Sequence, residues 1–210
     1  MKQSKTLRRW ELALLLGVAL AALLGVWLDG AQAALSDRVI RLHVLANSDS
    51  EADQALKLRV RDRILAEAEE LFVPGAGRAE TEELLRAHLY DLAAAGAEVV
   101  GEAGYSYPVT ASLVHDYWFP TKTYTDFALP AGAYTALRIE IGAGGGQNWW
   151  CVVFPPLCLG SVSETTQETA LEAGLTENQV SLMTGEDECY VVKFKAVELL
   201  EQFKGWLEGR

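Results

Sequence analysis

The chain has 210 residues, of which 29 are acidic and 18 are basic, so its formal net charge is −11. An acidic surface repels phosphate backbones, and the sequence lacks the basic and aromatic clusters typical of nucleic-acid binding, which excludes nucleic acid as a ligand. Half of the residues are hydrophobic (50%), which is enough for one domain with a substantial buried core.

Residues 1–33 have the organisation of a secretory signal peptide. Four basic residues precede an uncharged stretch at residues 12–28, and Ala31-Gln32-Ala33 has the small residues of a signal peptidase site. The apolar stretch is also at the short limit of a membrane span, so an uncleaved N-terminal anchor is the alternative. We expect residues 34–210 to form a single extracytoplasmic domain, with membrane contact confined to the N-terminal segment.

The elements that follow are predicted to be a strand and two helices. Residues 38–46 are rich in leucine and β-branched residues, which is typical of a strand. Serine and acidic residues three positions apart then form a capping box, and apolar residues recur at helical spacing to about Phe72, which predicts a long helix. A second helix is expected at about 80–98, after a Pro-Gly break.

Four strands joined by short turns are predicted in the middle of the chain. Residues 107–118 and 124–129 alternate in hydrophobicity on either side of a turn, and we expect them to form a hairpin. Residues 137–141 alternate in the same way, and a glycine run leads from them into residues 149–154, a second expected hairpin. Together the four strands would form an antiparallel meander.

The stretch at residues 149–154 is expected to be the centre of the fold, because six consecutive apolar residues indicate a strand buried on both sides. The rest of the chain is predicted to add a short helix within 166–173, a strand at 190–195 and a terminal helix at 196–206. The predicted fold class is α+β with two layers: a mainly antiparallel sheet of about six strands with helices packed on one face, preceded by an N-terminal signal or anchor helix.

The chain contains three cysteines, Cys151, Cys158 and Cys189. Export makes disulfide bonds chemically permissible, and two prolines between Cys151 and Cys158 would turn the chain back far enough for these two residues to form a bridge. Buried thiols that act as small hydrophobic side chains are the alternative.

Two stretches that resemble ligand-binding motifs have simpler explanations. The glycine run at 142–146 lacks the Lys-Ser/Thr pair of a phosphate loop and enters a strand, so we favour a hairpin turn. The acidic alternation from Asn47 to Asp53 begins like a calcium loop but lacks the glycine and the final glutamate that such a loop requires. A helix cap explains these residues without a metal ion.

No catalytic constellation is evident in the sequence. Cys151 is the candidate nucleophile and His43 or His115 the candidate base, but the apolar residues around Cys151 disfavour a lowered thiol pKa. The close paired spacing of zinc ligands is missing. We therefore predict no catalytic residue, no metal site and no cofactor.

Trp149 and Trp150 are adjacent on a predicted strand and must point to opposite faces of the sheet. If helices cover only one face, the other presents an aromatic patch of the kind that partner proteins bind. A sheet covered on both faces is the alternative.

Several motifs, in order along the chain, resemble one family. They are LHVLANSDS at 42–50, DQALKLRVRD at 53–62, YPV at 107–109, FPTKTY at 119–124, LPAGAY at 129–134, GQNWWCVVFPPLC at 146–158 and VVKFK at 191–195. Together they resemble the stage II sporulation protein R family. The resemblance implies a signalling protein that is made in the forespore and secreted into the space between forespore and mother cell. There it would trigger a membrane-embedded aspartic protease that processes the precursor of the mother-cell sigma factor, sigma E.

The resemblance thus implies a non-enzymatic activator whose partner is that protease, and it assigns no role to any single residue. The contact surface we predict comprises Phe119, Lys122, Tyr124, Asn148, Trp149 and Trp150. Two alternatives stay open: a secreted hydrolase that acts on the cell wall through a carboxylate or Cys151, and a membrane-anchored structural protein.

Overall fold

The computed structural model describes residues 11–19, 34–73, 75–124, 127–157 and 163–184. The chain divides into two units, Met1–Leu35 and Ser36–Arg210. In the first unit, residues 11–19 are helical. No helix among the described residues is both long enough and apolar enough to cross a bilayer. Most of the predicted signal or anchor segment lies outside the described residues, and its role stays a prediction.

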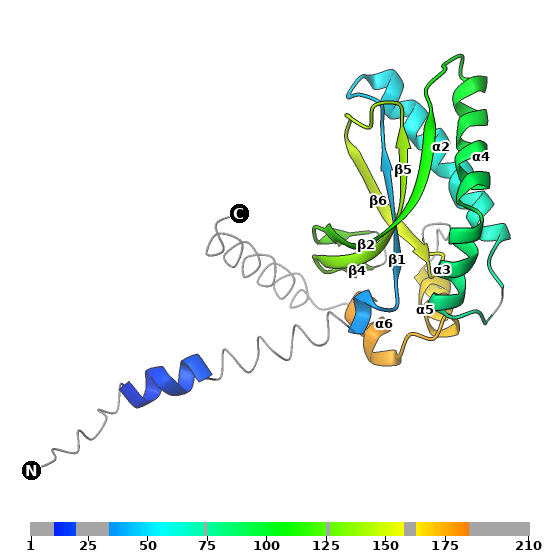
Figure 1. Ribbon diagram of the computed structural model, residues 1–210. Helices are drawn as coiled ribbons and strands as arrows, with labels where there is room; N and C mark the ends of the chain where they lie inside the picture. Colours follow the sequence, from blue (N-terminus) through cyan, green and yellow to red (C-terminus); the bar gives the residue numbers. More distant parts are fainter. Residues whose placement is uncertain (1–10, 20–33, 74, 125–126, 158–162, 185–210) are drawn as a thin grey trace, which may run out of the picture. The chain divides into compact units, whose positions relative to one another are not determined.

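The second unit is of the α+β class, as predicted (Figure 1). Its strands are β1 (Ile40–Leu45), β2 (Val109–Phe119), β3 (Lys122–Thr123), β4 (Ala128–Leu129), β5 (Gly132–Ile141) and β6 (Asn148–Phe154). Its helices are α2 (Glu51–Glu70), α3 (Arg78–Ala87), α4 (Leu89–Glu102), α5 (Ser163–Glu172) and α6 (Glu177–Thr184). The strand predicted at 190–195 and the helix predicted at 196–206 lie outside the described residues.

Four of the strands form one mixed sheet in the order β2-β5-β1-β6, and β3 pairs with β4 in a separate sheet. Strand β1 runs parallel to β5 and antiparallel to β6, while β2 is antiparallel to β5. The described strands therefore do not form the single, mainly antiparallel sheet that the sequence predicted. Strand β1 takes the inner position between β5 and β6, and all 6 of its residues are buried because both of its faces are covered.

Both predicted hairpins are wrong. Strand β2 continues through Phe119, which pairs with Gly132 of β5, and the segment between these residues makes an excursion in which β3 pairs with β4. Strands β5 and β6 are not neighbours, because β1 lies between them. The glycine run that joins them crosses the end of β1 and does not close a hairpin. Alternation in the sequence identified the strands but not their partners.

The apolar run at 149–154 lies in β6, at the edge of the described sheet and not at its centre. Residues 151–154 are buried, Trp149 and Trp150 are half-buried, and Asn148 is exposed. The run is apolar because both of its faces are covered over residues 151–154. A continuous apolar run indicates that both faces of a strand are covered, but it does not indicate that the strand has a neighbouring strand at each edge.

The long first helix is confirmed as α2, whereas the expected second helix is divided in two. Ser50 is the N-cap of α2, and its hydroxyl accepts a hydrogen bond from the backbone N–H of Asp53 at 3.2 Å, as the capping box predicts. Helices α3 and α4 meet at His88, whose φ of −106° and ψ of 15° interrupt the helical geometry. The helix expected within 166–173 is α5, and α6 follows it.

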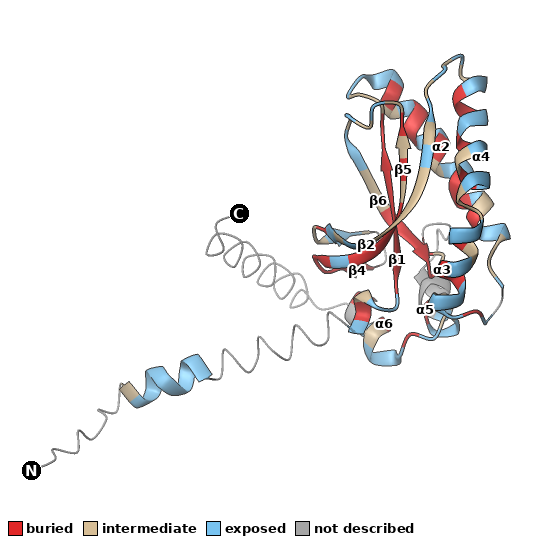
Figure 2. Ribbon diagram, in the orientation of Figure 1, coloured by how far each residue is buried: buried red, intermediate tan, exposed pale blue. Residues whose placement is uncertain are grey.

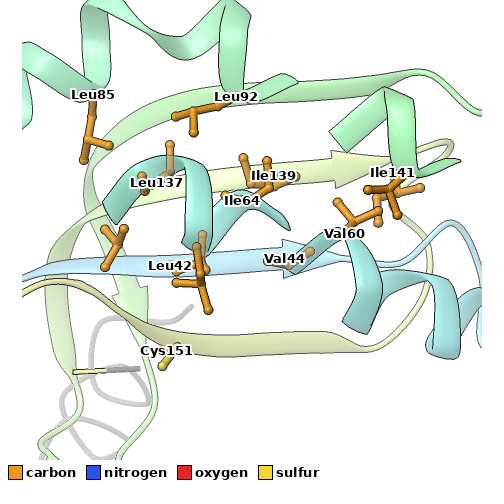
Figure 3. Packing of buried hydrophobic residues seen from close by; sticks show 14 of the residues in the cluster. Leu42, Val44, Val60, Ile64, Leu85, Leu92, Leu137, Ile139, Ile141 and Cys151 are labelled. Atoms are coloured by element: carbon orange, nitrogen blue, oxygen red, sulfur yellow. The ribbon is translucent and has the colours of Figure 1, made fainter. Parts of the chain in front are cut away.

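Helices α2 and α4 lie over one face of the sheet and form the main core with it (Figures 2 and 3). The residues of the sheet in this core include Leu42, Val44, Leu137, Ile139 and Cys151. Gly96 lets α4 approach the sheet closely, because a Cβ at this position would lie 2.9 Å from Cγ1 of Val109 in β2.

The loop that joins β1 to α2 is hydrogen-bonded to the glycine segment, which we define as residues 142–147. Asn47 Oδ1 accepts from the backbone N–H of Ala143 at 3.0 Å, and Asp49 Oδ1 accepts from that of Gln147 at 2.8 Å. Lys57 of α2 donates to the carbonyl of Gln147 at 2.9 Å. The two stretches that resembled ligand-binding motifs therefore bind each other.

Asp53 stabilises this loop from the helix side. Its Oδ2 accepts from the Ser48 hydroxyl at 2.5 Å and from the Asn47 amide at 2.9 Å. These hydrogen bonds, that from Ser48 first, hold the pKa of Asp53 below its usual value. The acidic alternation at 47–53 is thus a capping network whose oxygens accept from N–H and O–H groups.

Gly146 is predicted to tolerate no side chain. A Cβ there would lie 2.3 Å from the carbonyl oxygen of Ser48, whereas at Gly145 the nearest atom, the carbonyl oxygen of Asn47, would be 3.5 Å away. We expect Gly146→Ala to lower the free energy of unfolding by about 2 kcal/mol or more, and Gly145→Ala to change it by less than about 0.5 kcal/mol. Urea denaturation measures both. Equal effects would show that the two segments are not packed this closely.

Candidate functional site

The sheet face opposite α2 and α4 carries a group of polar and aromatic side chains. Because successive residues of a strand point to opposite faces, Arg41 and His43 lie on this face while Leu42 and Val44 pack under the helices. Side chains from other strands and from the β3–β4 excursion surround them. We call the group the His43 face; its members are Arg41, His43, Tyr117, Phe119, Tyr124, Tyr134, Arg138, Asn148 and Trp150.

His43 is at the centre of this face, and only 1% of it is exposed. Its Nε2 lies 2.8 Å from Oδ1 of Asn148, and its ring centroid is 5.1 Å from that of Tyr117 and 6.2 Å from that of Trp150. Burial lowers the pKa of His43; the hydrogen bond to Asn148 opposes this effect, and the charge of Arg138 adds to it. The ring is therefore held neutral near pH 7. In the tautomer that donates from Nε2, Nδ1 has no hydrogen-bond partner among the described residues.

Arg41 is fully buried beside His43 on β1. Its Cζ lies 4.1 Å from the ring centroid of Phe119 and 4.9 Å from that of Tyr134, so aromatic rings contact the positive charge. Its Nη2 donates to the hydroxyl of Tyr124 at 3.4 Å. Within the described part of the chain, Nε and Nη1 have no hydrogen-bond partner, and no carboxylate forms an ion pair with the guanidinium.

Tyr124 connects Arg41 to Trp150. Its hydroxyl accepts from Arg41 and donates to the backbone carbonyl of Trp150 at 3.3 Å, while its ring stacks on Phe127 with centroids 4.4 Å apart. Burial raises the pKa of Tyr124, so the hydroxyl keeps its proton. The indole Nε1 of Trp150 is buried and has no partner in the residues that the structure describes.

Part of the His43 face reaches the surface. Asn148 is exposed, and Tyr117, Arg138 and Trp150 are half-buried (Figure 2). The side chains are carried by paired strands, which fixes their spacing. The group offers N–H donors and aromatic surface, a combination that suits recognition of another molecule.

A second polar network joins α3 to β2 and β5. His115 Nδ1 lies 3.2 Å from Thr135 Oγ1, and its Nε2 lies 3.4 Å from Glu82 Oε1. Hydroxyl, imidazole and carboxylate follow one another as in a nucleophilic triad. Thr135 is buried, however, and its oxygen also accepts from Arg78, while Glu82 pairs with Arg78 and Arg86. The network holds α3 against the sheet and leaves the hydroxyl inaccessible.

Comparison with known proteins decides the family. A model of the stage II sporulation protein R family matches residues 36–164. The chain belongs to this family. Stage II sporulation protein R of Bacillus subtilis (strain 168) is 38% identical to it over 124 residues, which are 59% of this chain and 55% of that protein. The chain thus spans little more than half the length of this relative, and no solved structure matches it.

Membership of the stage II sporulation protein R family supports a role in sporulation. The matched region runs from before β1 to the start of α5, so it contains the capping loop, the glycine segment and the whole His43 face. The candidate site therefore lies in the part of the chain that defines the family.

The structure brings four of the six predicted contact residues together. Tyr124, Asn148 and Trp150 belong to the His43 face, and Phe119 does too but is fully buried. Lys122 is exposed in β3. Trp149 lies on the helix side, where the guanidinium of Arg61 is 4.5 Å from its ring centroid. The prediction that Trp149 and Trp150 point to opposite faces is confirmed.

Cys151 does not form the thiol site considered in the sequence analysis. It is disulfide-bonded and buried on the helix side of β6, opposite to the face that carries His43. Cys158 and Cys189 lie outside the described residues, so the Cys151–Cys158 pairing stays a prediction. Among the described residues, no three His, Cys, Asp or Glu side chains are grouped as a metal site requires.

The sequence analysis did not single out Arg41, and it did not place His43 in a binding surface. The signal was present: an arginine and a histidine alternate with aliphatic residues in the first strand of the second unit. Polar residues that alternate with aliphatic ones usually face water. Here aromatic side chains such as Phe119 and Tyr134 cover the face that carries Arg41 and His43, and they come from strands far along the chain.

The lowered pKa of His43 predicts an acid-sensitive stability. A histidine whose folded pKa lies below its unfolded value of 6.5 binds protons more readily in the unfolded chain, so the free energy of unfolding falls as the pH drops below that value. We expect His43→Gln to lose this dependence, because its side chain does not titrate. Urea denaturation at about pH 7.5 and about pH 5.5 measures the effect.

The matched control is His88→Gln. His88 is partly exposed at the junction of α3 and α4 and lies outside the His43 face, so the variant should keep the loss of stability at low pH that burial of His43 causes. If wild type and His43→Gln lose the same free energy between the two pH values, His43 is not held neutral by burial.

Proposed function

We propose that this chain is a non-enzymatic signalling protein of sporulation that acts by binding another protein. In this proposal it is exported across the cytoplasmic membrane, from the forespore into the intermembrane space. There it activates a membrane-embedded aspartic protease that processes the precursor of the mother-cell sigma factor sigma E. The family supports the sporulation role, and the basic and apolar N-terminal residues support export.

The His43 face is the observation that carries the binding role. Trp150 and Tyr117 are half-buried and present aromatic surface where the His43 face meets solvent, and Asn148 is exposed. Buried N–H donors lie behind them. Aromatic anchors next to desolvated polar groups are the composition of binding hot spots in protein interfaces.

A hydrolytic role has less support. The sulfur of Cys151 is in a disulfide bond, and the Thr135 hydroxyl is buried within the network of α3. Nucleophilic catalysis requires an accessible nucleophile with a base in reach. Neither of these two residues supplies it.

Activation by binding requires a differential affinity. A ligand shifts its target toward an active state only by as much as it binds that state more tightly than the inactive one. A shift from about 1% to about 99% active requires roughly 5.5 kcal/mol of difference. Two or three aromatic anchors such as Trp150, each contributing about 2 kcal/mol or more to binding of the active state alone, would supply a difference close to this value.

The test is reconstitution in a non-sporulating host. The chain is co-expressed with the protease and the sigma precursor, with and without residues 1–33, and precursor cleavage is followed by immunoblot. We expect cleavage to depend on the exported domain. Trp150→Ala should reduce it about tenfold, because losing an aromatic anchor costs at least about 1.4 kcal/mol of binding.

Tyr90→Ala is the matched control, because Tyr90 is an aromatic residue of α4 that is 84% exposed and away from the His43 face. It should leave cleavage within about twofold of the wild type, with Trp150→Ala shown to be folded by its melting curve. Cleavage that does not require the domain would refute the signalling role. Equal activity of the two variants would refute the His43 face as the contact.

A further inference from the structure

Arg41 carries a charge that no carboxylate among the described residues neutralises. It is fully buried, its Nε and Nη1 have no partner, and no described carboxylate pairs with it. Its Nη2 donates to the hydroxyl of Tyr124 at 3.4 Å, at the weak end of the range, and the hydroxyl of Tyr134 is a second uncharged acceptor beside the guanidinium. We therefore expect Arg41 to add nothing to the free energy of unfolding of the isolated domain, or to lower it.

The aromatic contacts offset only part of the cost of burying this charge. Removing a guanidinium from water is costly unless a counter-charge and good hydrogen bonds replace the lost hydration. Phe119 and Tyr134 supply ring faces at 4.1 and 4.9 Å, which attract the cation but accept no N–H bond in its plane. What Arg41 lacks is an anionic acceptor.

The His43 face holds two further buried N–H donors, one on β5 and one on β6. Trp150 Nε1 and Arg138 Nε are buried donors on the same face, and neither has a partner among the described residues. Glu140 pairs with Arg138 through Nη1 at 2.9 Å and leaves Nε unpaired. The face is therefore rich in N–H donors and poor in acceptors, although the chain as a whole is strongly acidic.

We infer that Arg41 is the anchor of a carboxylate-binding site, and that the carboxylate is an acidic side chain of the protein partner. The inference rests on the proposed function and adds to it the chemical group that the partner presents. Binding would displace the hydroxyl of Tyr124 from Arg41, so the guanidinium would exchange a long hydrogen bond to an uncharged hydroxyl for an ion pair with a carboxylate. Arg41 would then be a binding residue that the free domain holds at a cost.

The first experiment compares the free domain with its Arg41→Met variant, in which an apolar side chain of similar length replaces the charge. If Arg41 is unpaired until the partner binds, the variant should melt within about 2 °C of the wild type or above it. A fall of more than about 5 °C would show that Arg41 holds the fold together, and would overturn the inference.

The second experiment probes the ligand chemistry with sodium formate, the smallest carboxylate, against sodium chloride at equal ionic strength. Formate at about a hundredfold excess over its Kd should raise the melting temperature of the wild type by several degrees and leave Arg41→Met unchanged. Arg59→Met is the control, because Arg59 is an exposed arginine of α2 and its variant should keep the formate response. No response in the wild type would overturn the assignment of a carboxylate.

The third experiment identifies the source of the carboxylate by testing Arg41→Met in the reconstituted protease assay. If Arg41→Met is folded, shows no formate response and does not trigger cleavage, the result supports an acidic group of the partner as the source of the carboxylate. A variant that loses the formate response but signals like the wild type shows a site for small carboxylates alone, which overturns the partner assignment. If the wild type itself fails to trigger cleavage, the proposed function is wrong, whereas the formate result still decides whether the site exists.

Discussion

The constraint on which the structure depends is the contact between the loop at 46–53 and the glycine segment at 142–147. Strand β1 enters the sheet between two strands that are joined to each other, so the connection from β5 to β6 must pass over its end. That crossing leaves no space for side chains at Gly146, and Asn47 and Asp49 hold it through backbone N–H groups. The same loop caps α2 through Ser50 and Asp53, so one cluster fixes the sheet order and the start of the main helix.

Strand β1 is an inner strand covered on both faces, so none of its side chains is exposed to water. Arg41 and His43 alternate with Leu42 and Val44, and they are carried into the interior by the same register that places the aliphatic residues under α2. For His43 the result is a lowered pKa, and for Arg41 it is a guanidinium held by aromatic rings.

The sequence predicted what depends on neighbours along the chain, and it failed where distant segments decide. Helix α2, its Ser50 cap and the opposite orientation of Trp149 and Trp150 follow from local periodicity, and the structure has all three. The order of the strands does not follow from periodicity, because a buried run such as residues 149–154 has the same pattern at a sheet edge as at its centre. The candidate site was half predicted for the same reason: its aromatic members were visible in the sequence, whereas Arg41 became a candidate only when β1 proved to be an inner strand.

A rigid sheet face is a suitable element for an activating ligand. A ligand shifts the equilibrium of its target only by as much as it binds one state more tightly than the other. If the ligand had to order its own loops on binding, the entropy cost would reduce the net binding free energy. Trp150, Asn148 and His43 lie on adjacent paired strands, and their spacing is set before any partner arrives. The buried donors of this face that have no hydrogen-bond partner among the described residues are fixed in the same way. Under the carboxylate proposal, a partner that supplies acceptors to them would gain hydrogen bonds without first having to order the face.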